Sequence, residues 1–181
     1  MLTGRRVAYL ELLSCPEYGT IDVGSESGER SEPHGEDFVT AQDNIFTIQC
    51  AQDGVADVAL IVEEWTGAPA SDPPGWRTWE LESQHELEIE EYLVIAAPGT
   101  QGDDLRGLRL RAGYGVYHCR IRAQGRTEVR RRIAELARRD ELLERANDLD
   151  GIERYLIQFW PSQKNHNSIE TEGNLPITLH I

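Results

Sequence analysis

Alternation of apolar and polar residues is the feature that most constrains this chain. Nine segments place apolar side chains at every second position, which is the period of a strand buried on one face. Turn-forming residues separate the segments, so each strand is short. Nine short strands favour a mainly β fold, an antiparallel two-sheet β-sandwich that occupies residues 1–181 as a single domain. The segments are residues 7–13, 44–50, 57–65, 85–89, 92–96, 108–111, 115–123, 155–160 and 177–181.

The apolar positions of the central segments predict the core. A chain of 181 residues is long enough to bury one well-formed core without disulfides or metal. Side chains that share one parity along a strand lie on one face of the sheet. The predicted inward residues are Phe46, Ile48, Leu60, Val62, Tyr117, Cys119, Ile121, Tyr155, Ile157 and Phe159.

One segment has the period of a helix instead. Residues 127–148 carry an apolar stripe at a spacing of 3.6 residues, and Thr127 is a suitable N-terminal cap. Because this segment lies between two strand patterns, we expect one inserted helix laid on a face or edge of a sheet. The stripe consists of Val129, Ile133, Leu136 and Leu143, with Ala137 and Ala146.

Two long loops interrupt the strand pattern. Residues 24–37 are acidic and contain no large apolar side chain, which predicts an exposed loop. The second loop, residues 66–79, contains three prolines but also Trp76 and Trp79. Since indole rings are costly to leave in water, this loop is expected to pack down.

Charge is distributed unevenly along the chain. The formal net charge is −14, and residues 1–100 carry 20 acidic and only 4 basic side chains. Such a surface repels the phosphate backbone, so direct nucleic-acid binding is not expected. An acidic surface attracts a basic protein partner instead.

The location of the protein is predicted from two further features. The apolar run of residues 7–13 is broken by Glu11 and is interpreted as a strand, and no segment approaches the roughly 18 apolar residues that span a membrane. Cys15, Cys50 and Cys119 are odd in number and widely spaced, which is typical of reduced thiols in the cytoplasm. The oligomeric state is not predicted by any of these features.

Motifs of known chemistry are missing from the sequence. It has no phosphate-binding glycine loop, no nucleophile elbow, and no closely spaced histidines or cysteines that could start a metal site. We therefore predict no catalytic residues, no metal and no cofactor, and we favour a binding protein over an enzyme.

Three groups of residues are candidates for a binding site. Glu86, Glu88 and Glu90 alternate with apolar residues and share one strand face, while His118, Arg120 and Arg122 share the outer face of another strand. The third group is Trp65, Trp76 and Trp79. A simpler interpretation is that the glutamate strand pairs internally with arginines of a neighbouring strand. The arginines concerned are Arg109, Arg111, Arg120 and Arg122.

Three segments resemble a known pattern: GVYHCRIRAQGR (115–126), ERYLIQFWP (153–161) and LIVEEWTG (60–67). They resemble uncharacterised bacterial sandwich proteins that are distantly similar to the competence protein J family. The better-known members of that family are described as nuclease inhibitors. The resemblance implies a β-sandwich with an inhibitory binding role and supplies no catalytic residues. The inserted helix departs from the simplest form of the pattern.

Three functions remain open at this point. The first is an inhibitor, antitoxin or immunity-like protein that blocks a basic protein through its acidic surface. The second is a sandwich that binds a small ligand or carbohydrate through its tryptophans. The third is an enzyme with a site dispersed over several strands, in which His118, Arg120 and Arg122 are the residues to test first.

Overall fold

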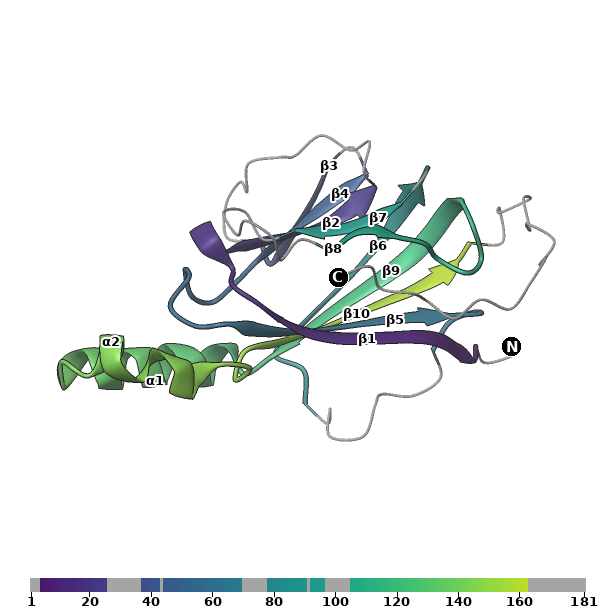
Figure 1. The fold of residues 1–181 in the computed structure, drawn as a ribbon. Coiled ribbons are helices and arrows are strands. Elements are labelled where there is room, and N and C mark those ends of the chain that lie inside the picture. Colours follow the sequence, from purple (N-terminus) through teal and green to yellow (C-terminus); the bar gives the residue numbers. More distant parts are fainter. Residues whose placement is uncertain are drawn as a thin grey trace.

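The fold is mainly β, with two five-stranded sheets (Figure 1). The computed structural model describes residues 4–25, 37–42, 44–69, 78–90, 92–96 and 105–162. Sheet A has the strand order β1-β5-β10-β9-β6 and consists of β1 (Arg6–Ser14), β5 (Val58–Trp65), β6 (Leu81–Ile89), β9 (Gly115–Gln124) and β10 (Arg154–Pro161). Sheet B has the order β3-β4-β2-β7-β8 and consists of β2 (Thr20–Ser25), β3 (Val39–Gln42), β4 (Ile45–Gln49), β7 (Leu93–Ala96) and β8 (Leu105–Leu108).

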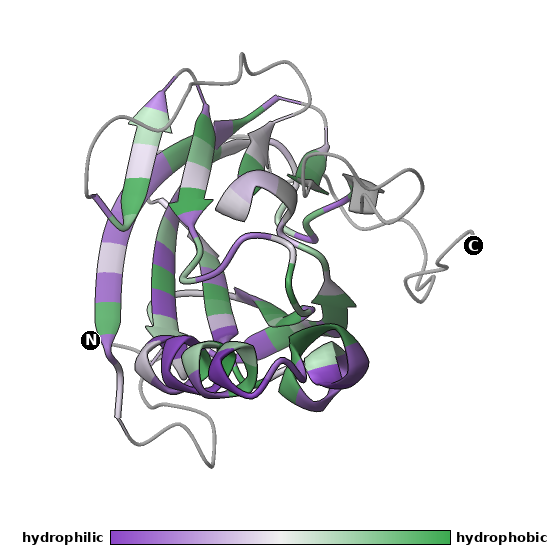
Figure 2. Ribbon diagram, turned by 90° about the vertical axis from the view of Figure 1, so that its left-hand side faces the viewer, coloured by the Kyte–Doolittle hydropathy of each residue, from purple (hydrophilic) through white to green (hydrophobic). Residues whose placement is uncertain are grey.

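One hydrophobic core joins the two sheets. It takes side chains from β2, β4 and β7 of sheet B and from β5, β6, β9 and β10 of sheet A. All ten predicted core residues belong to it, so the predicted parity of the central strands is confirmed. Figure 2 shows the alternation of apolar and polar residues along the strands that produces this division of faces.

The two sheets are not entirely antiparallel, which corrects the expectation from sequence. β10 lies between β5 and β9; it is antiparallel to β9 but parallel to β5. The central residue Ile157 pairs with Val62 on one side and Ile121 on the other. A parallel pair is possible here because β5 and β10 are joined by a long stretch of chain and not by a hairpin.

Sheet B contains two strands that the sequence did not predict, β2 and β3. All six residues of β2 are buried, and Gly24 and Ser25 are part of the strand, so the exposed loop expected over 24–37 begins later. Residues 26–36 lie outside the described residues. The buried carboxylate of Asp22 accepts a hydrogen bond from the Thr47 hydroxyl at 2.8 Å, which satisfies a polar group that alternation alone could not place in a strand.

Two other strand predictions need comment. The strand expected at 108–111 is wrong in its bounds: β8 covers Leu105–Leu108, so only Leu108 is shared. After the strand, Gly113 closes a turn by donating its N–H to the Leu110 carbonyl. The strand expected at 177–181 lies outside the described residues. The remaining seven predicted strands correspond to β1, β4, β5, β6, β7, β9 and β10.

The segment 127–148 is not one helix but three short elements: α1 (Arg126–Arg138), α2 (Leu142–Arg145) and the 3-10 helix η2 (Ala146–Leu149). Asp140 has a left-handed backbone with φ of 59°. The N–H groups of Asp140 and Glu141 turn back to the carbonyls of Ala137 and Leu136, which closes α1. The break rotates Leu143 out of the predicted stripe, and it is 97% exposed.

The helices do not lie on a sheet face; they extend from one end of the molecule (Figure 1). Val129 and Leu136 of α1 form a small separate cluster with Leu149 of η2 and Ala56 of the β4–β5 connection. α1 follows directly after β9 of sheet A. The chain turns between the two elements at Gly125, whose φ is 79°. A β-carbon at Gly125 would lie 1.9 Å from the Ile152 carbonyl oxygen, so only glycine fits.

The N-terminus of α1 is capped by a distant residue and not by Thr127. The Glu80 carboxylate accepts the N–H of Gly125 at 2.7 Å and the N–H of Thr127 at 3.0 Å, and the Thr127 hydroxyl donates to the same carboxylate at 3.1 Å. Glu80 thus satisfies backbone donors that a helix leaves unpaired at its start. Its negative charge also interacts favourably with the helix dipole.

Candidate protein-binding surface

The outer face of sheet A is the face turned away from the core. Polar side chains of β6 and β9 meet there in register: Glu82 lies opposite Arg122, Gln84 opposite Arg120, Glu86 opposite His118, and Glu88 opposite Val116. The two strands alternate in the same phase, so these residues all point outward. The structure thereby brings two of the predicted groups, the glutamates of β6 and the cations of β9, onto one surface.

A row of buried polar groups crosses the middle of this face. The Glu63 carboxylate is fully buried; it accepts hydrogen bonds from Arg6 at 2.7 Å, from Trp65 Nε1 at 2.9 Å and from the Gln158 amide at 2.7 Å. The Gln158 carbonyl in turn accepts two bonds from Arg120, at 2.9 and 2.6 Å. Since every buried group here is paired, the row fixes the positions of the outer side chains.

Arg122 is a structural residue of this face. Its Nε lies 2.8 Å from the Glu82 carboxylate, and its guanidinium lies 4.8 Å from the centre of the Trp79 ring. Trp79 itself packs on Ile61 and Leu156. The loop that carries Trp79 is therefore packed down at this residue, as the sequence predicts.

His118 and Arg120 surround a single aromatic ring. The imidazole of His118 lies 5.5 Å from the centre of the Trp160 ring, and the Arg120 guanidinium lies 5.9 Å from it. His118 Nδ1 is 3.6 Å from the Glu86 carboxylate. These contacts hold the histidine beside a tryptophan that sequence reasoning did not select, because only the pairing of β9 with β10 places Trp160 opposite His118.

Carboxylates are in excess along β6, the edge strand of sheet A. Glu86 has a side chain 55% exposed, Glu88 is exposed opposite the uncharged Val116, and Glu90 is exposed just beyond the end of the strand. The Glu82–Arg122 ion pair supports the interpretation that glutamates and arginines pair across strands. Two of the other arginines make different contacts: the Arg109 guanidinium donates to the Tyr92 hydroxyl, and the backbone N–H of Arg111 donates to Glu64.

Two of the three predicted tryptophans lie on the same face of the fold. Trp65 and Trp79 lie on the outer face of sheet A, where the first bonds Glu63 and the second lies against Arg122. Trp76 lies outside the described residues. Both described rings therefore have contacts within the fold and do not form an open aromatic platform.

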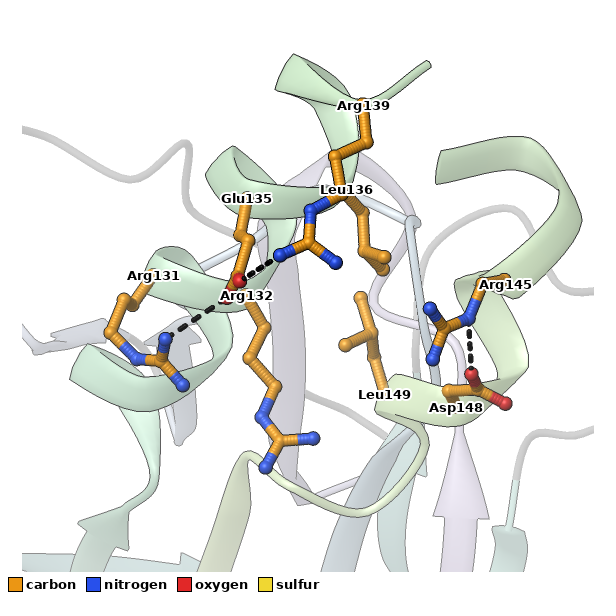
Figure 3. Close-up of a pocket in the computed structure, with 8 residues that line it drawn as sticks. All are labelled: Arg131, Arg132, Glu135, Leu136, Arg139, Arg145, Asp148 and Leu149. Atoms are coloured by element: carbon orange, nitrogen blue, oxygen red, sulfur yellow. Dashed lines mark hydrogen bonds and ion pairs between the residues drawn. The ribbon is translucent and has the colours of Figure 1, made fainter. Parts of the chain in front are cut away.

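A second surface feature is a hollow of about 400 Å³ between α1 and η2 (Figure 3). Four arginines line it over an apolar floor of Leu136 and Leu149, and each pairs with an acidic side chain: Arg139 lies 2.7 Å from Glu135, and Arg145 lies 2.8 Å from Asp148. The other two are Arg131, which pairs with Glu128 and Glu135, and Arg132, which pairs with Glu128. Because each arginine has an acidic partner beside it, the hollow is a locally balanced surface.

Titratable groups near the sheets are mainly perturbed by burial. Burial lowers the pKa of His85, whose ring lies 4.9 Å from Phe46 and 2.6 Å from the Ser83 hydroxyl, and thus favours the neutral form. Burial also raises the pKa of the Cys50 and Cys119 thiols, so both stay protonated. These two cysteines are inert core residues and not nucleophiles.

The part of the chain that the structure describes contains neither a candidate metal site nor a candidate membrane-spanning helix. No group of three or more histidine, cysteine or acidic side chains in it is arranged to hold a metal ion. No helix within the same residues has the length and apolar character needed to cross a bilayer.

Comparison with known proteins supports the fold. No family model matches the chain, and no curated protein sequence matches it. One solved structure is similar, a crystal structure of ComJ, described as the inhibitor of the DNA-degrading activity of NucA, from Bacillus subtilis. The match has a TM-score of 0.56 at 11% sequence identity, and covers 89% of this chain and 100% of that chain. The resemblance to the competence protein J family that the sequence indicates is therefore confirmed as a distant structural likeness.

Proposed function

We propose that this protein is a non-catalytic binding protein that blocks a basic protein partner, in the manner of an inhibitor, antitoxin or immunity protein. The observation that carries the proposal is the set of exposed carboxylates on the edge of sheet A: Glu86, Glu88 and Glu90. Glu82 has an arginine beside it, whereas Glu86 has a histidine and Glu88 faces an uncharged residue. A row of exposed carboxylates attracts a basic surface and accelerates its encounter.

The scaffold supports this role. Since both sheets contribute to one core, we propose that they form a β-sandwich, and a paired sheet face is a rigid surface for a partner. ComJ, the structural relative, is described as an inhibitor of a nuclease activity, which is the same kind of role. Cys15, Cys50 and Cys119 are reduced cysteines, which fits an action in the cytoplasm.

Nucleic acid is a poorer partner for this molecule. The net charge of −14 opposes any approach of a phosphate backbone. The arginines of the α1 hollow are paired with carboxylates, which reduces their attraction for phosphate. We therefore propose that the protein acts on another protein and not on DNA or RNA directly.

The proposal is tested by capture followed by kinetics. The protein is used to capture partners from a lysate of its source organism at low salt, and the captured proteins are identified by mass spectrometry. The association rate of the main partner is then measured over a range of ionic strength, and its activity is measured with increasing inhibitor. We expect a basic partner, stoichiometric inhibition, and an association rate that falls steeply as salt increases.

A charge-removing variant and its control identify the surface. Glu86→Gln with Glu88→Gln should slow association by about three- to tenfold at low salt, with the melting temperature unchanged. Asp140→Asn with Glu144→Gln removes the same charge from the exposed end of the helical segment and should leave association unchanged. A captured partner whose binding ignores salt and the β6 variant would overturn the proposal.

A further inference from the structure

A small cavity opens between an edge strand of one sheet and an edge strand of the other. β1 is an edge strand of sheet A and β8 is an edge strand of sheet B, and the cavity between them has a volume of about 200 Å³. This volume equals roughly six or seven water molecules, so it suits a ligand of fragment size. Its lining is mainly aliphatic and includes Ala8, Leu10, Val62, Leu93, Leu108 and Leu110.

One charged group is buried in the wall of this apolar cavity. Glu64 follows Leu60 and Val62 along the inner parity of β5, and it is 3% exposed. Its two carboxylate oxygens accept the backbone N–H groups of Arg111 at 2.9 Å and Ala112 at 3.0 Å. These two bonds fix the carboxylate in place but add no positive charge.

The charge of Glu64 is poorly compensated. Burial raises the pKa of Glu64, and attraction to the Arg111 charge is the smallest of the influences that oppose this. No ion pair of Glu64 occurs within the described residues. Arg109, which also lines the cavity, is turned elsewhere: its guanidinium lies 5.1 Å from the centre of the Tyr92 ring and donates to the Tyr92 hydroxyl at 2.9 Å.

We propose that this cavity binds a small primary amine, with the apolar body among the aliphatic side chains and the ammonium group at the Glu64 carboxylate. Each carboxylate oxygen has a second lone pair to offer once the backbone N–H is bound. A buried charge is costly until it is paired, so a cation gains more at this site than a neutral ligand does.

Ligand chemistry is tested with three probes that share a phenethyl body and differ in the polar end group: phenethylamine, 2-phenylethanol and 3-phenylpropanoate. Binding is followed by amide chemical shifts of the ¹⁵N-labelled full chain. We expect the amine to bind about tenfold more tightly than the alcohol, and the anion not to bind. The largest shifts should include the amides of Arg111 and Ala112, since these donate to Glu64.

Two variants and a control locate the site. Ala8→Leu fills the cavity and should abolish binding of amine and alcohol alike, whereas Ala41→Leu, the same change on the exposed edge strand β3, should have no effect. Glu64→Gln should remove the preference for the amine while binding of the alcohol persists. If Glu64→Gln does not fold, two measurements still decide the question. These are the ratio of amine to alcohol affinity in the unmodified protein and the comparison of Ala8→Leu with Ala41→Leu.

Several outcomes overturn the proposal. Equal affinity for amine and alcohol, or a preference for the anion, shows that Glu64 does not select the ligand. Undiminished binding in Ala8→Leu, or shifts confined to residues away from Arg111 and Ala112, places the ligand elsewhere. None of these results bears on the β6 carboxylates, so the proposed inhibitory function stands or falls separately.

Discussion

Removal of the Glu80 carboxylate should loosen α1 from the sheets. Glu80→Ala leaves the N–H groups of Gly125 and Thr127 without their acceptor, and it removes a negative charge from the positive end of the helix. Loss of a cap costs typically about 1 kcal/mol, and loss of the charge at an exposed helix N-terminus adds about 0.3–1 kcal/mol. We therefore expect a destabilisation of about 1–2 kcal/mol.

The assay separates a local effect from a global one. For a chain of this size the expected loss lowers the melting temperature by about 2–8 °C, measured by circular dichroism. Amide exchange should accelerate most in the first turn of α1 and less in the core strands β5 and β10. Thr127→Ala serves as a control, because it removes only the hydroxyl bond to Glu80 at 3.1 Å. An unchanged melting temperature together with unchanged exchange in α1 would refute the capping role.

Other substitutions test the core and the helix ends. Ile121→Asp should abolish the native near-ultraviolet circular dichroism, because it puts an unpaired charge where no side-chain area is exposed; a cooperative thermal transition in this variant would contradict the assigned parity. Ile133→Asp should loosen the small helical cluster and cost less stability, as measured by urea unfolding. Gly125→Ala should destabilise by about 2 kcal/mol or more through the clash with the Ile152 carbonyl. Asp140→Gly should stabilise by about 1 kcal/mol, since glycine adopts the left-handed conformation without strain; a lower melting temperature would argue against the observed end of α1.

The sequence predicted the core because side-chain alternation is a local property. In a strand with one solvent-exposed face, every second residue is apolar and buried. Tyr117, Cys119 and Ile121 could therefore be placed in the core without knowledge of any partner strand. The same logic placed His118, Arg120 and Arg122 together on the outer face. It could not say that Arg122 is covered by Trp79 or that His118 lies beside Trp160, since those contacts depend on strand order.

Features set by long-range contacts were missed. β2 contains Asp22 and Gly24, which weaken any strand pattern, and its burial depends on Thr47 and on the neighbouring strands of sheet B. The break in the helical segment occurs at Asp140, a residue that gives a weaker stop signal than glycine. The amphipathic period continues past this point in the sequence, and Leu143 was assigned to the buried stripe for that reason.

The parallel pairing of β5 with β10 has a consequence for how the chain folds. The bond between Glu63 and Gln158 joins residues 95 positions apart, and β10 is the last of the five sheet A strands in chain order. Contacts of such large sequence separation form slowly. Until they form, unpaired strand edges promote aggregation with other chains. Within sheet A, a nascent chain that has not yet reached Arg154 can assemble only the pairs β1–β5 and β6–β9, whose facing edges stay open until the final strand is inserted between them.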